Sequence, residues 1–462
     1  MIHLKKVGVF ATLSAVLLVS ACSGNSGGDS KGEAKSGKKT VVVSVMTKDR
    51  FLESAVQKFE ESHPDVHIEV KEYKAAKPAA EGGMSMEALS LADVEKYVQS
   101  VTTQVISGKG ADIILMNEMP QDKFVAKKLL VNMYDLMAKD NSFDRNALYA
   151  NILKASQDGD GLYVMPLSYS LDLVRGDTEL LKKANVPVDK NKSWSWMEFK
   201  EIAKKLKQQG YDGFGNLSPT ELLWDYIEDN YSQLVGQGKP GFDSDLFRNM
   251  MKEIKLMYDE GMLNEGLSGF SSTSGTGKSA FLLAGIYSPE EALKMPSNMD
   301  YFPKPSASGK KSGVPFKFNY SLGINSKSDV QQEAWAFIKF LLSSDMQASP
   351  NLMGFPMNKG AVDQKFNEVL QKFKNGTLNE QTPRNGGVSA ATPPNMLPDG
   401  ETAKKRIEDI KKMITEADVR RSSDMKVLMI AMEEFKSFMS GQKSAEEVSN
   451  LIQNRVKIYL NE

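Results

Sequence analysis

Few residues of this chain have the types and spacing needed for metal, nucleotide or covalent chemistry. His63 and His67 are four residues apart, but Pro64 prevents the regular helix that would present both imidazoles to one metal ion. The segment 275–279 (GTGKS) is similar to a phosphate-binding loop, but Ser272 stands where such a loop needs its first glycine. We therefore expect no bound metal and no nucleotide or other cofactor.

Acidic residues offer a second kind of chemistry. Residues 158–161 and 243–245 are rich in Asp, but neither segment has the later glutamate and full spacing of a calcium loop, so turns are the simpler interpretation. The chain has 59 Asp and Glu residues, and the carboxyl separation that defines a glycoside hydrolase is spatial. A glycan-active enzyme outside the cytoplasm therefore stays open as an alternative.

Composition excludes several classes of protein. The chain has 462 residues, enough for two or three domains, and is 41% apolar and 25% charged, as soluble globular proteins are. Its net charge of −1 gives no cationic surplus for phosphate binding, so we expect no nucleic-acid partner. One Cys excludes internal disulfides, and three His leave little room for a zinc site or a His-based triad.

The N-terminus indicates the compartment. Lys5 and Lys6 precede an apolar stretch over 7–21, which is too short to span a bilayer and is typical of a secretory signal. The sequence VSAC that ends at Cys22 resembles the bacterial lipobox, so we expect 1–21 to be removed and Cys22 to be lipidated. Residues 22–39 then form a flexible tether. This arrangement predicts a protein anchored by lipid to the outer face of the cell membrane.

Alternating strands and helices must position any binding residues in the body of the chain. Residues 40–46 form an apolar, β-branched run typical of a buried strand, and apolar residues from Leu52 to Phe59 recur at helical spacing. Residues 66–70 alternate as a half-buried strand does, 94–105 repeat the helical spacing, and 111–116 form another apolar strand. This order predicts a parallel sheet with right-handed crossovers.

Capping patterns predict further helices. The pairs Ser195/Glu198, Ser328/Gln331 and Ser444/Glu447 have the spacing of capping boxes, and residues 428–439 carry one apolar face before Gly441. The segments 74–84, 268–277 and 384–400 are expected to be loops, because Gly, Pro or Ser residues interrupt them.

Short motifs occur in one order over most of residues 40–345. They are FEESHPDV at 59–66, GKGADII at 108–114, DGLYVMP at 160–166, WSWMEF at 194–199, GKSAF at 277–281, LGIN at 322–325 and EAWAFI at 333–338. In this order they resemble the family 1 extracellular solute-binding proteins of bacterial ABC importers, the maltose-binding-protein-like group. Residues 175–177 (RGD) depart from the Tyr-Asn pair that the family often has after the hinge strand.

The resemblance implies an α/β protein with a two-lobed periplasmic-binding-protein-like fold. Each lobe would be a mostly parallel sheet flanked by helices, with crossovers between the lobes at a hinge. We expect the first lobe to contain residues 40–168 and about 320–380, the second lobe to contain 169–319 and about 385–462, and the protein to be a monomer.

Ligand-binding residues are expected where strands end at the cleft, because ligands of open α/β sheets bind beyond the carboxyl ends of strands. For Trp224 and Tyr287 the resemblance implies an aromatic clamp stacked on a sugar ring, and core packing is the other interpretation of each. The expected contacts are Lys48, Asp49, Arg50, Asn117 and Glu118 in the first lobe, Tyr169 and Ser170 at the hinge, Trp224, Asp225 and Tyr287 in the second lobe, and Asn319 and Tyr320 at the return crossing.

The resemblance implies a binding protein rather than an enzyme. It would capture a solute, most simply a sugar or oligosaccharide, between its lobes and deliver it to the permease subunits of an ABC transporter. A sensory binding protein that presents its loaded form to a receptor is the second alternative, beside the glycan-active enzyme.

Overall fold

The computed structural model describes residues 37–461 except 75–89, 191, 216, 237–239, 264–278, 284, 307–312 and 379–396. The expected signal peptide, the lipidated Cys22 and most of the tether lie outside the described residues, as do most of the three expected loops. Residues 38–462 form one compact unit, and the description below concerns that unit.

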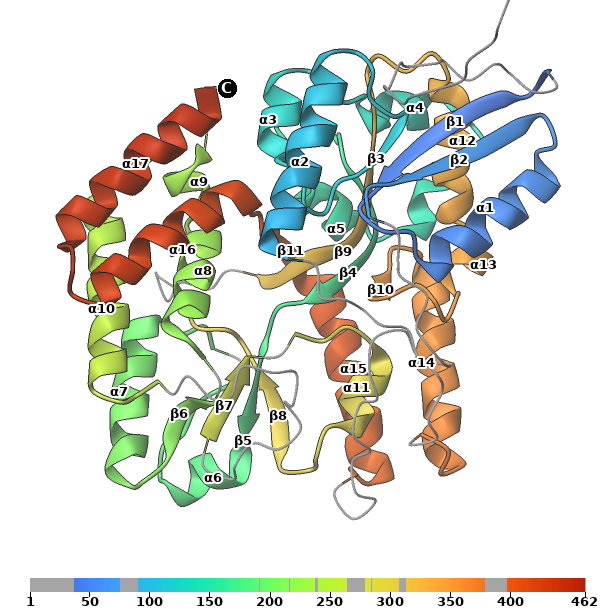
Figure 1. Ribbon diagram of the computed structural model, residues 1–462. Coiled ribbons are helices and arrows are strands. Elements are labelled where there is room, and N and C mark those ends of the chain that lie inside the picture. The colour runs from blue at the N-terminus through green and yellow to red at the C-terminus, as the bar shows by residue number, and fades with distance from the viewer. Residues whose placement is uncertain are drawn as a thin grey trace, which may run out of the picture. The chain divides into compact units, whose positions relative to one another are not determined.

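The first of two sheets has seven strands in the order β10-β4-β9-β3-β1-β2, with β11 paired to β9 (Figure 1). Strand β1 runs parallel to β2 and β3, whereas β9 runs antiparallel to β3 and β4. The strands span β1 Lys39–Val45, β2 Val66–Glu72, β3 Ile113–Leu115, β4 Met165–Leu171, β9 Val314–Ile324, β10 Phe355–Pro356 and β11 Ala417–Arg420.

The second sheet has four strands in the order β6-β7-β5-β8. Strand β5 runs antiparallel to β7 and β8, and only β6 and β7 are parallel. The expected parallel pairing is confirmed for β1, β2 and β3 of the first sheet. The second sheet is mostly antiparallel instead, because β5 enters it against the direction of β7 and β8. The strands span β5 Val174–Asp177, β6 Asp212–Gly215, β7 Ser279–Leu283 and β8 Met299–Phe302.

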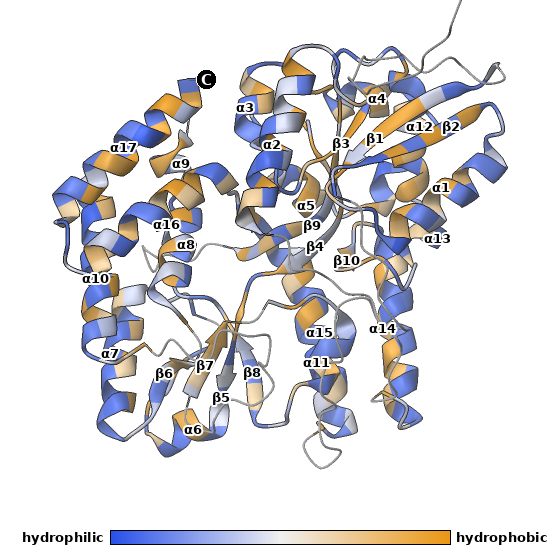
Figure 2. Ribbon diagram, viewed as in Figure 1, coloured by the Kyte–Doolittle hydropathy of each residue, from blue (hydrophilic) through white to orange (hydrophobic). Residues whose placement is uncertain are grey.

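The first hydrophobic core lies around the seven-stranded sheet. In α1, Phe51, Leu52, Ala55 and Phe59 are buried on one face, and the Asp49 side chain caps the helix by accepting from the Leu52 backbone N–H. Figure 2 shows that hydrophobic and hydrophilic residues alternate along the helices in this way. The helices of this core span α1 Arg50–Ser62, α4 Met133–Lys139, α5 Ala150–Ala155, α12 Gln331–Leu341, α13 Ser344–Gln347 and α14 Lys359–Lys374, with a 3-10 turn at Arg145–Ala147. Helices α2 Leu91–Ile106 and α3 Gln121–Ala126 pack in a separate hydrophobic cluster beside the same sheet.

Two later helices also contribute to the first core. They are α15 (Gly400–Glu416), through Ala403, Ile407, Ile410 and Ile414, and α11 (Pro289–Lys294), through Ala292 and Leu293. The lobe boundaries expected from sequence assign both helices to the second lobe. Their apolar side chains belong to the same hydrophobic cluster as those of the first sheet, and the expected boundaries stay a prediction.

The second core lies around the four-stranded sheet. The capping boxes at Ser195/Glu198 and Ser444/Glu447 are confirmed. Ser328 does not cap α12, because its hydroxyl donates to Asp112 Oδ1 (2.7 Å). The helices here span α6 Thr178–Lys183, α7 Trp196–Gln208, α8 Pro219–Asp229, α9 Tyr231–Leu234, α10 Asp245–Asp259, α16 Met425–Met439 and α17 Ala445–Asn461.

In the described chain, the polypeptide passes from one sheet to the other between β4 and β5 and between β8 and β9. It passes from the first sheet to the second core between β11 and α16. The residues near these connections therefore come from both cores. Over the part of the chain that is described, none of the helices combines the length and apolar character needed to cross a membrane.

Candidate ligand-binding site

A cavity of about 240 Å³ lies where the ends of several elements from both cores meet. Its walls come from the residues after β3, from α3, α8 and α9, from β9, and from the segment at the end of β11. Strand ends of this kind are where α/β proteins bind ligands. The described residues that line the cavity are Met116, Asn117, Glu118, Met119, Gln121, Asp122, Trp224, Glu228, Tyr231, Lys317, Phe318, Arg420, Arg421, Ser422 and Ser423.

Asn117 connects one wall of the cavity to strand β9. Its side-chain nitrogen donates to the carbonyl oxygen of Asn319 (2.6 Å), and its side-chain oxygen accepts from the backbone N–H of Ser321 (3.0 Å). These bonds hold the end of β3 against β9, so the backbone position of the next residue, Glu118, is fixed at the cavity.

Two carboxyl groups on this wall have raised pKa values. Glu118 is half-buried, and burial raises the pKa of its carboxyl. Asp122, in the first turn of α3, has a solvent-exposed side chain, but the protein around it removes enough water to raise its pKa, and the nearby Asp158 adds to this effect. Arg420 partly offsets the rise.

The opposite wall presents the ring of Trp224 from α8. The indole nitrogen donates to Glu228 Oε1 (2.8 Å), one turn further along the helix, and Glu228 Oε2 lies 2.7 Å from Lys317 Nζ on β9. These contacts fix one edge of a half-buried aromatic ring in the cavity wall. A ring held in this way can stack on the apolar face of a ligand.

The two arginines that follow β11 are engaged with protein partners. Arg420 donates to Gln121 Oε1 (2.9 Å) and lies over the ring of Phe318, with its guanidinium carbon 5.6 Å from the ring centre. Arg421 pairs with Asp172 (3.3 Å) and with Asp229.

Near the cavity, a second group of charges is buried around Lys304. Its ammonium nitrogen lies 2.5 Å from Asp225 Oδ1 and 3.2 Å from Asp172 Oδ2. Burial favours the neutral amine, but both carboxylates outweigh it and raise the pKa of Lys304. Burial likewise opposes ionisation of Asp172, yet Lys304, Lys317 and Arg421 hold its pKa well below the usual range. This cluster joins the segments that connect the two sheets.

The structure brings three of the expected ligand contacts to the cavity, namely Asn117, Glu118 and Trp224. The expected clamp is not assembled there, because Tyr287 is 46% exposed and is not among the described residues that line the cavity. Asp225 is buried and forms an ion pair with Lys304.

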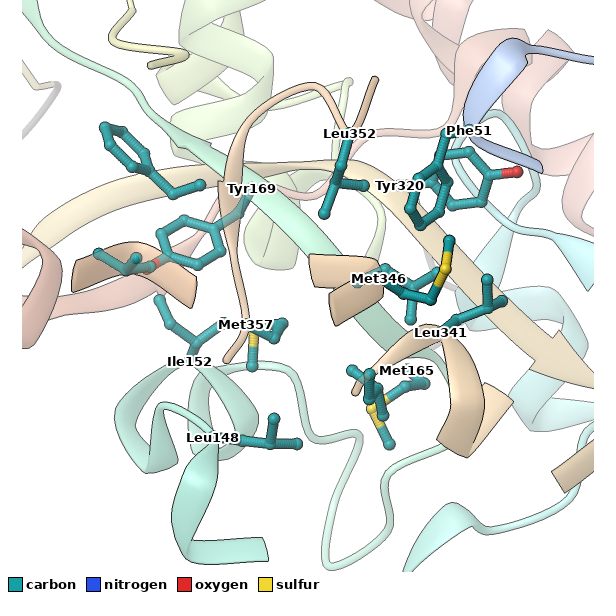
Figure 3. Close-up of a cluster of buried hydrophobic side chains, with 14 of the residues drawn as sticks. Phe51, Leu148, Ile152, Met165, Tyr169, Tyr320, Leu341, Met346, Leu352 and Met357 are labelled. Atoms are coloured by element: carbon teal, nitrogen blue, oxygen red, sulfur yellow. The ribbon is translucent and has the colours of Figure 1, made fainter. Parts of the chain in front are cut away.

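Tyr169, expected at the hinge, and Tyr320, expected at the return crossing, both lie in the first core (Figure 3). Tyr169 is completely buried, with Phe316 and Phe355 beside its ring, and Tyr320 lies against Phe51 with the ring centres 5.6 Å apart. Every residue of β4 is buried, and the Tyr169 ring packs in the core instead of lining the cavity.

The remaining expected contacts have structural partners. Lys48 lies 3.3 Å from Glu53, Asp49 caps α1, and Arg50 is the first residue of that helix. The Ser170 hydroxyl donates to Asn319 Oδ1 (3.1 Å), beside strand β10. None of these residues is among the described lining of the cavity.

Sequence reasoning missed the wall formed by residues 420–423. Strand β11 has only four residues, and it pairs with β9, which lies about 100 positions earlier in the chain. The Arg420–Arg421 pair and the two serines after it were the available signal, but without the strand nothing placed them at a sheet edge. In the described ranges, no group of three or more His, Cys, Asp and Glu residues is arranged to hold a metal ion.

Comparisons with known proteins concern the family and the fold. The sequence matches the family of bacterial extracellular solute-binding proteins over residues 44–348. A similar solved structure is the sugar-binding protein MalE from Xanthomonas citri, with a TM-score of 0.57 and 15% identity over 92% of this chain and 98% of that one.

Two further structures are similar. An ABC substrate-binding protein from Listeria monocytogenes, in complex with cycloalternan, has a TM-score of 0.55 and 16% identity over 92% of this chain and 99% of that one. Maltose-bound MalE3 from T. maritima has a TM-score of 0.54 and 17% identity over 91% of this chain and 99% of that one. At these identities the likeness concerns the fold, and it confirms the two-lobed periplasmic-binding-protein class. Because the family match covers more than half of the chain, the protein belongs to the bacterial extracellular solute-binding proteins, a family of binding proteins rather than enzymes.

Proposed function

We propose that the protein captures a saccharide in the cavity and delivers it to the permease subunits of an ABC transporter. Family membership supports solute binding, and the similar proteins include a sugar-binding protein, a cycloalternan complex and a maltose complex. The observation that carries the proposal is a cavity that combines the Trp224 ring with the amide of Asn117 and the carboxyl of Glu118. An aromatic face and hydrogen-bonding groups are what a sugar ring requires.

Release and capture of the ligand would involve movement of the two cores about their connections. A ligand that contacts both walls has a higher affinity for the arrangement in which the walls are close, and this difference is what drives closure. The closed form then presents a composite surface to the permease.

A thermal-shift screen of the protein against mono- and oligosaccharides, amino acids and polyamines tests the function. A ligand at one hundred times its Kd stabilises the folded state by about 2.7 kcal/mol, so a saccharide should raise the melting temperature by at least a degree or two. Stabilisation by amino acids or polyamines alone, with no response to any saccharide, would contradict the proposal.

We further propose that the protein is monomeric and catalyses no reaction on its ligand. The mixture of a bound saccharide and the protein should therefore show no shorter sugars by chromatography after prolonged incubation. Steady, protein-dependent release of shorter sugars would favour the glycan-active enzyme instead.

The anchor is a separate proposal, supported by the lone Cys at a lipobox-like junction. Replacing Cys22→Ser removes the thiol that carries the lipid, so the protein should leave the detergent phase or accumulate as an uncut precursor. Equal partitioning of the variant and the native protein into detergent would contradict a lipid anchor at Cys22.

A further inference from the structure

The cations and the carboxyl groups that line the cavity differ in whether they have partners within the protein. Its three cations are engaged with protein partners: Lys317 with Glu228, Arg420 with Gln121, and Arg421 with Asp172 and Asp229. A ligand would therefore find no cation on the described lining that lacks an acceptor already.

The carboxyls of Glu118 and Asp122 are in the opposite state. Among the described residues, neither side chain forms an ion pair or a hydrogen bond with another residue, although both line the cavity. The Glu118 carboxyl accepts from its own backbone N–H, and Arg420 acts on Asp122 only through its charge. Partly desolvated carboxylates without partners are unfavourable, and a ligand that supplies a donor or a positive charge relieves that cost. The raised pKa values of both groups are a consequence of this environment.

Charges just beyond the lining add to the negative potential. Asp424, at the start of α16, is 4% exposed and caps its helix, and the pKa of its carboxyl is raised by burial, with Asp122 contributing. Asp158 faces Asp122 from the segment before β4 and lies 3.9 Å from Arg420. A ligand carboxylate would meet this potential with no available cation to offset it.

The volume and the aromatic wall limit the ligand further. About 240 Å³ is below the range of roughly 300–1,000 Å³ that drug-sized ligands occupy, so the cavity fits a small solute or one unit of a longer chain. The half-buried Trp224 ring favours a ligand with an apolar ring face, which a sugar has and a linear polyamine lacks.

We propose that the cavity selects saccharides that carry a protonated amino group, with Glu118 and Asp122 receiving the ammonium group beside the Trp224 ring. The inference rests on the proposed function and narrows its ligand class. It orders three classes of saccharide by affinity: amino sugars bind most tightly, neutral sugars less tightly, and uronic acids least.

The test is calorimetric titration at pH 7 and low salt with D-glucosamine and its β-1,4 dimer, D-glucose and cellobiose, and D-glucuronate. We expect the amino sugar of each matched pair to bind at least about tenfold more tightly than its neutral counterpart, which corresponds to about 1.4 kcal/mol, and D-glucuronate to bind most weakly. Putrescine serves as a cation without a ring.

Variants test the two carboxyls. The double variant Glu118→Gln, Asp122→Asn should lose the preference for the amino sugar and keep its affinity for the neutral sugar within about threefold. Glu69→Gln, at an exposed position of β2, is the matched control and should change neither. Circular dichroism melts of the ligand-free proteins show whether each variant is folded.

Several outcomes would overturn the inference. They are equal or tighter binding of the neutral sugars or of D-glucuronate, a preference that survives the double variant, or tighter binding of putrescine than of any saccharide. Binding of neutral saccharides without preference leaves the proposed function intact and removes only the amino-sugar inference. The absence of a response to every saccharide removes both.

Discussion

The carboxyl groups beside the cavity fall into two groups with opposite electrostatic states. Asp172 and Asp225 lie against Lys304, and the pKa of Asp172 is well below its usual range. Glu118 and Asp122 lack such partners among the described residues, and their pKa values are raised. The paired carboxylates join the segments that connect the sheets, whereas we propose that the unpaired carboxylates receive a ligand.

The largest expected effect comes from breaking the paired group. Lys304→Met removes one buried charge at similar volume and leaves Asp225 without a cation at contact distance, so it should lower the free energy of unfolding by about 3–5 kcal/mol. Denaturant unfolding at pH 7 measures the loss. A loss below about 1 kcal/mol would show that solvent already screens the cluster.

Lys190→Met is the matched control for that experiment. Lys190 pairs with Asp300 (2.6 Å), but both side chains are more than a quarter exposed, so the pair should contribute only about 0–1 kcal/mol. The contrast between the two lysines isolates burial as the cause.

The next effect concerns the aromatic wall. Trp224→Ala should weaken saccharide binding by about 2–3 kcal/mol, or roughly 30- to 150-fold, because ring stacking and apolar burial are both lost. Tyr287→Ala, outside the described lining, should change the affinity less than about threefold. Calorimetry combined with melts of the ligand-free variants separates binding from folding.

The same experiment can also reverse the assignment of Trp224 to the binding site and of Tyr287 outside it. Unchanged affinity in Trp224→Ala with a lowered melting temperature would place the ring in the core. A large loss of affinity in Tyr287→Ala would restore the clamp that the sequence suggests and would move the site away from the cavity.

A smaller effect is expected from pH, and its sign follows from the unpaired group. A bound ammonium group lowers the pKa of Glu118 and Asp122, so binding releases protons and the affinity falls as pH is lowered from 7 into the range above their ordinary values of about 4. Asp158, Asp424 and Arg420 also face this region and contribute to the profile. D-glucosamine should lose more affinity than D-glucose on acidification, and the reverse order would contradict the assignment.

Asp172 gives the stability of the fold a pH dependence of the same sign, for a different reason. Because its pKa is lower in the folded protein than in the unfolded chain, its stabilising contribution is present above the unfolded pKa of about 3.9 and is lost as pH falls through the folded value. In Lys304→Met that loss should begin at a higher pH, which acid titration followed by circular dichroism measures. An identical acid transition in both proteins would show that Lys304 does not set this pKa.

The smallest effect is expected at the contact between α2 and α16. Glu95 and Lys426 form an ion pair there, with both side chains about one-third exposed. Nearby in the fold, between α3 and α17, Lys123 lies 4.8 Å from the centre of the Tyr459 ring. Lys426→Ala should change stability by less than about 1 kcal/mol and ligand dissociation less than about threefold at physiological salt. Stopped-flow measurements that show a tenfold faster dissociation would make this pair a major determinant of closure.

Local periodicity was sufficient to predict much of the fold. Strands β1 and β3 follow from apolar runs, β2 from alternating spacing, and helices α1 and α2 from helical spacing. Strand direction could not be predicted in the same way. The direction of β9 depends on pairing with β3 and β4, which lie more than 140 residues earlier, and no local pattern encodes it.

The candidate site was predictable where a residue directly follows a recognisable strand or a family motif, as with Asn117, Glu118 and Trp224. Tyr169 shows the limit of that rule. Its strand is buried along its whole length, so the sequence pattern does not indicate which residues face the cleft. The lobe boundaries expected from sequence stay a prediction, with α15 and α11 packed on the first core.

The most direct test of this account places a single thiol in the cavity wall. In a Cys22→Ser background, Ser423→Cys carries the only thiol of the chain, at an exposed position on the lining. Its rate of modification by a thiol reagent is measured with increasing concentrations of the saccharide that stabilises the protein most. We expect at least tenfold protection that saturates with the calorimetric Kd, whereas Tyr287→Cys in the same background stays unprotected. An unchanged rate for Ser423→Cys at saturating saccharide would show that the ligand binds elsewhere.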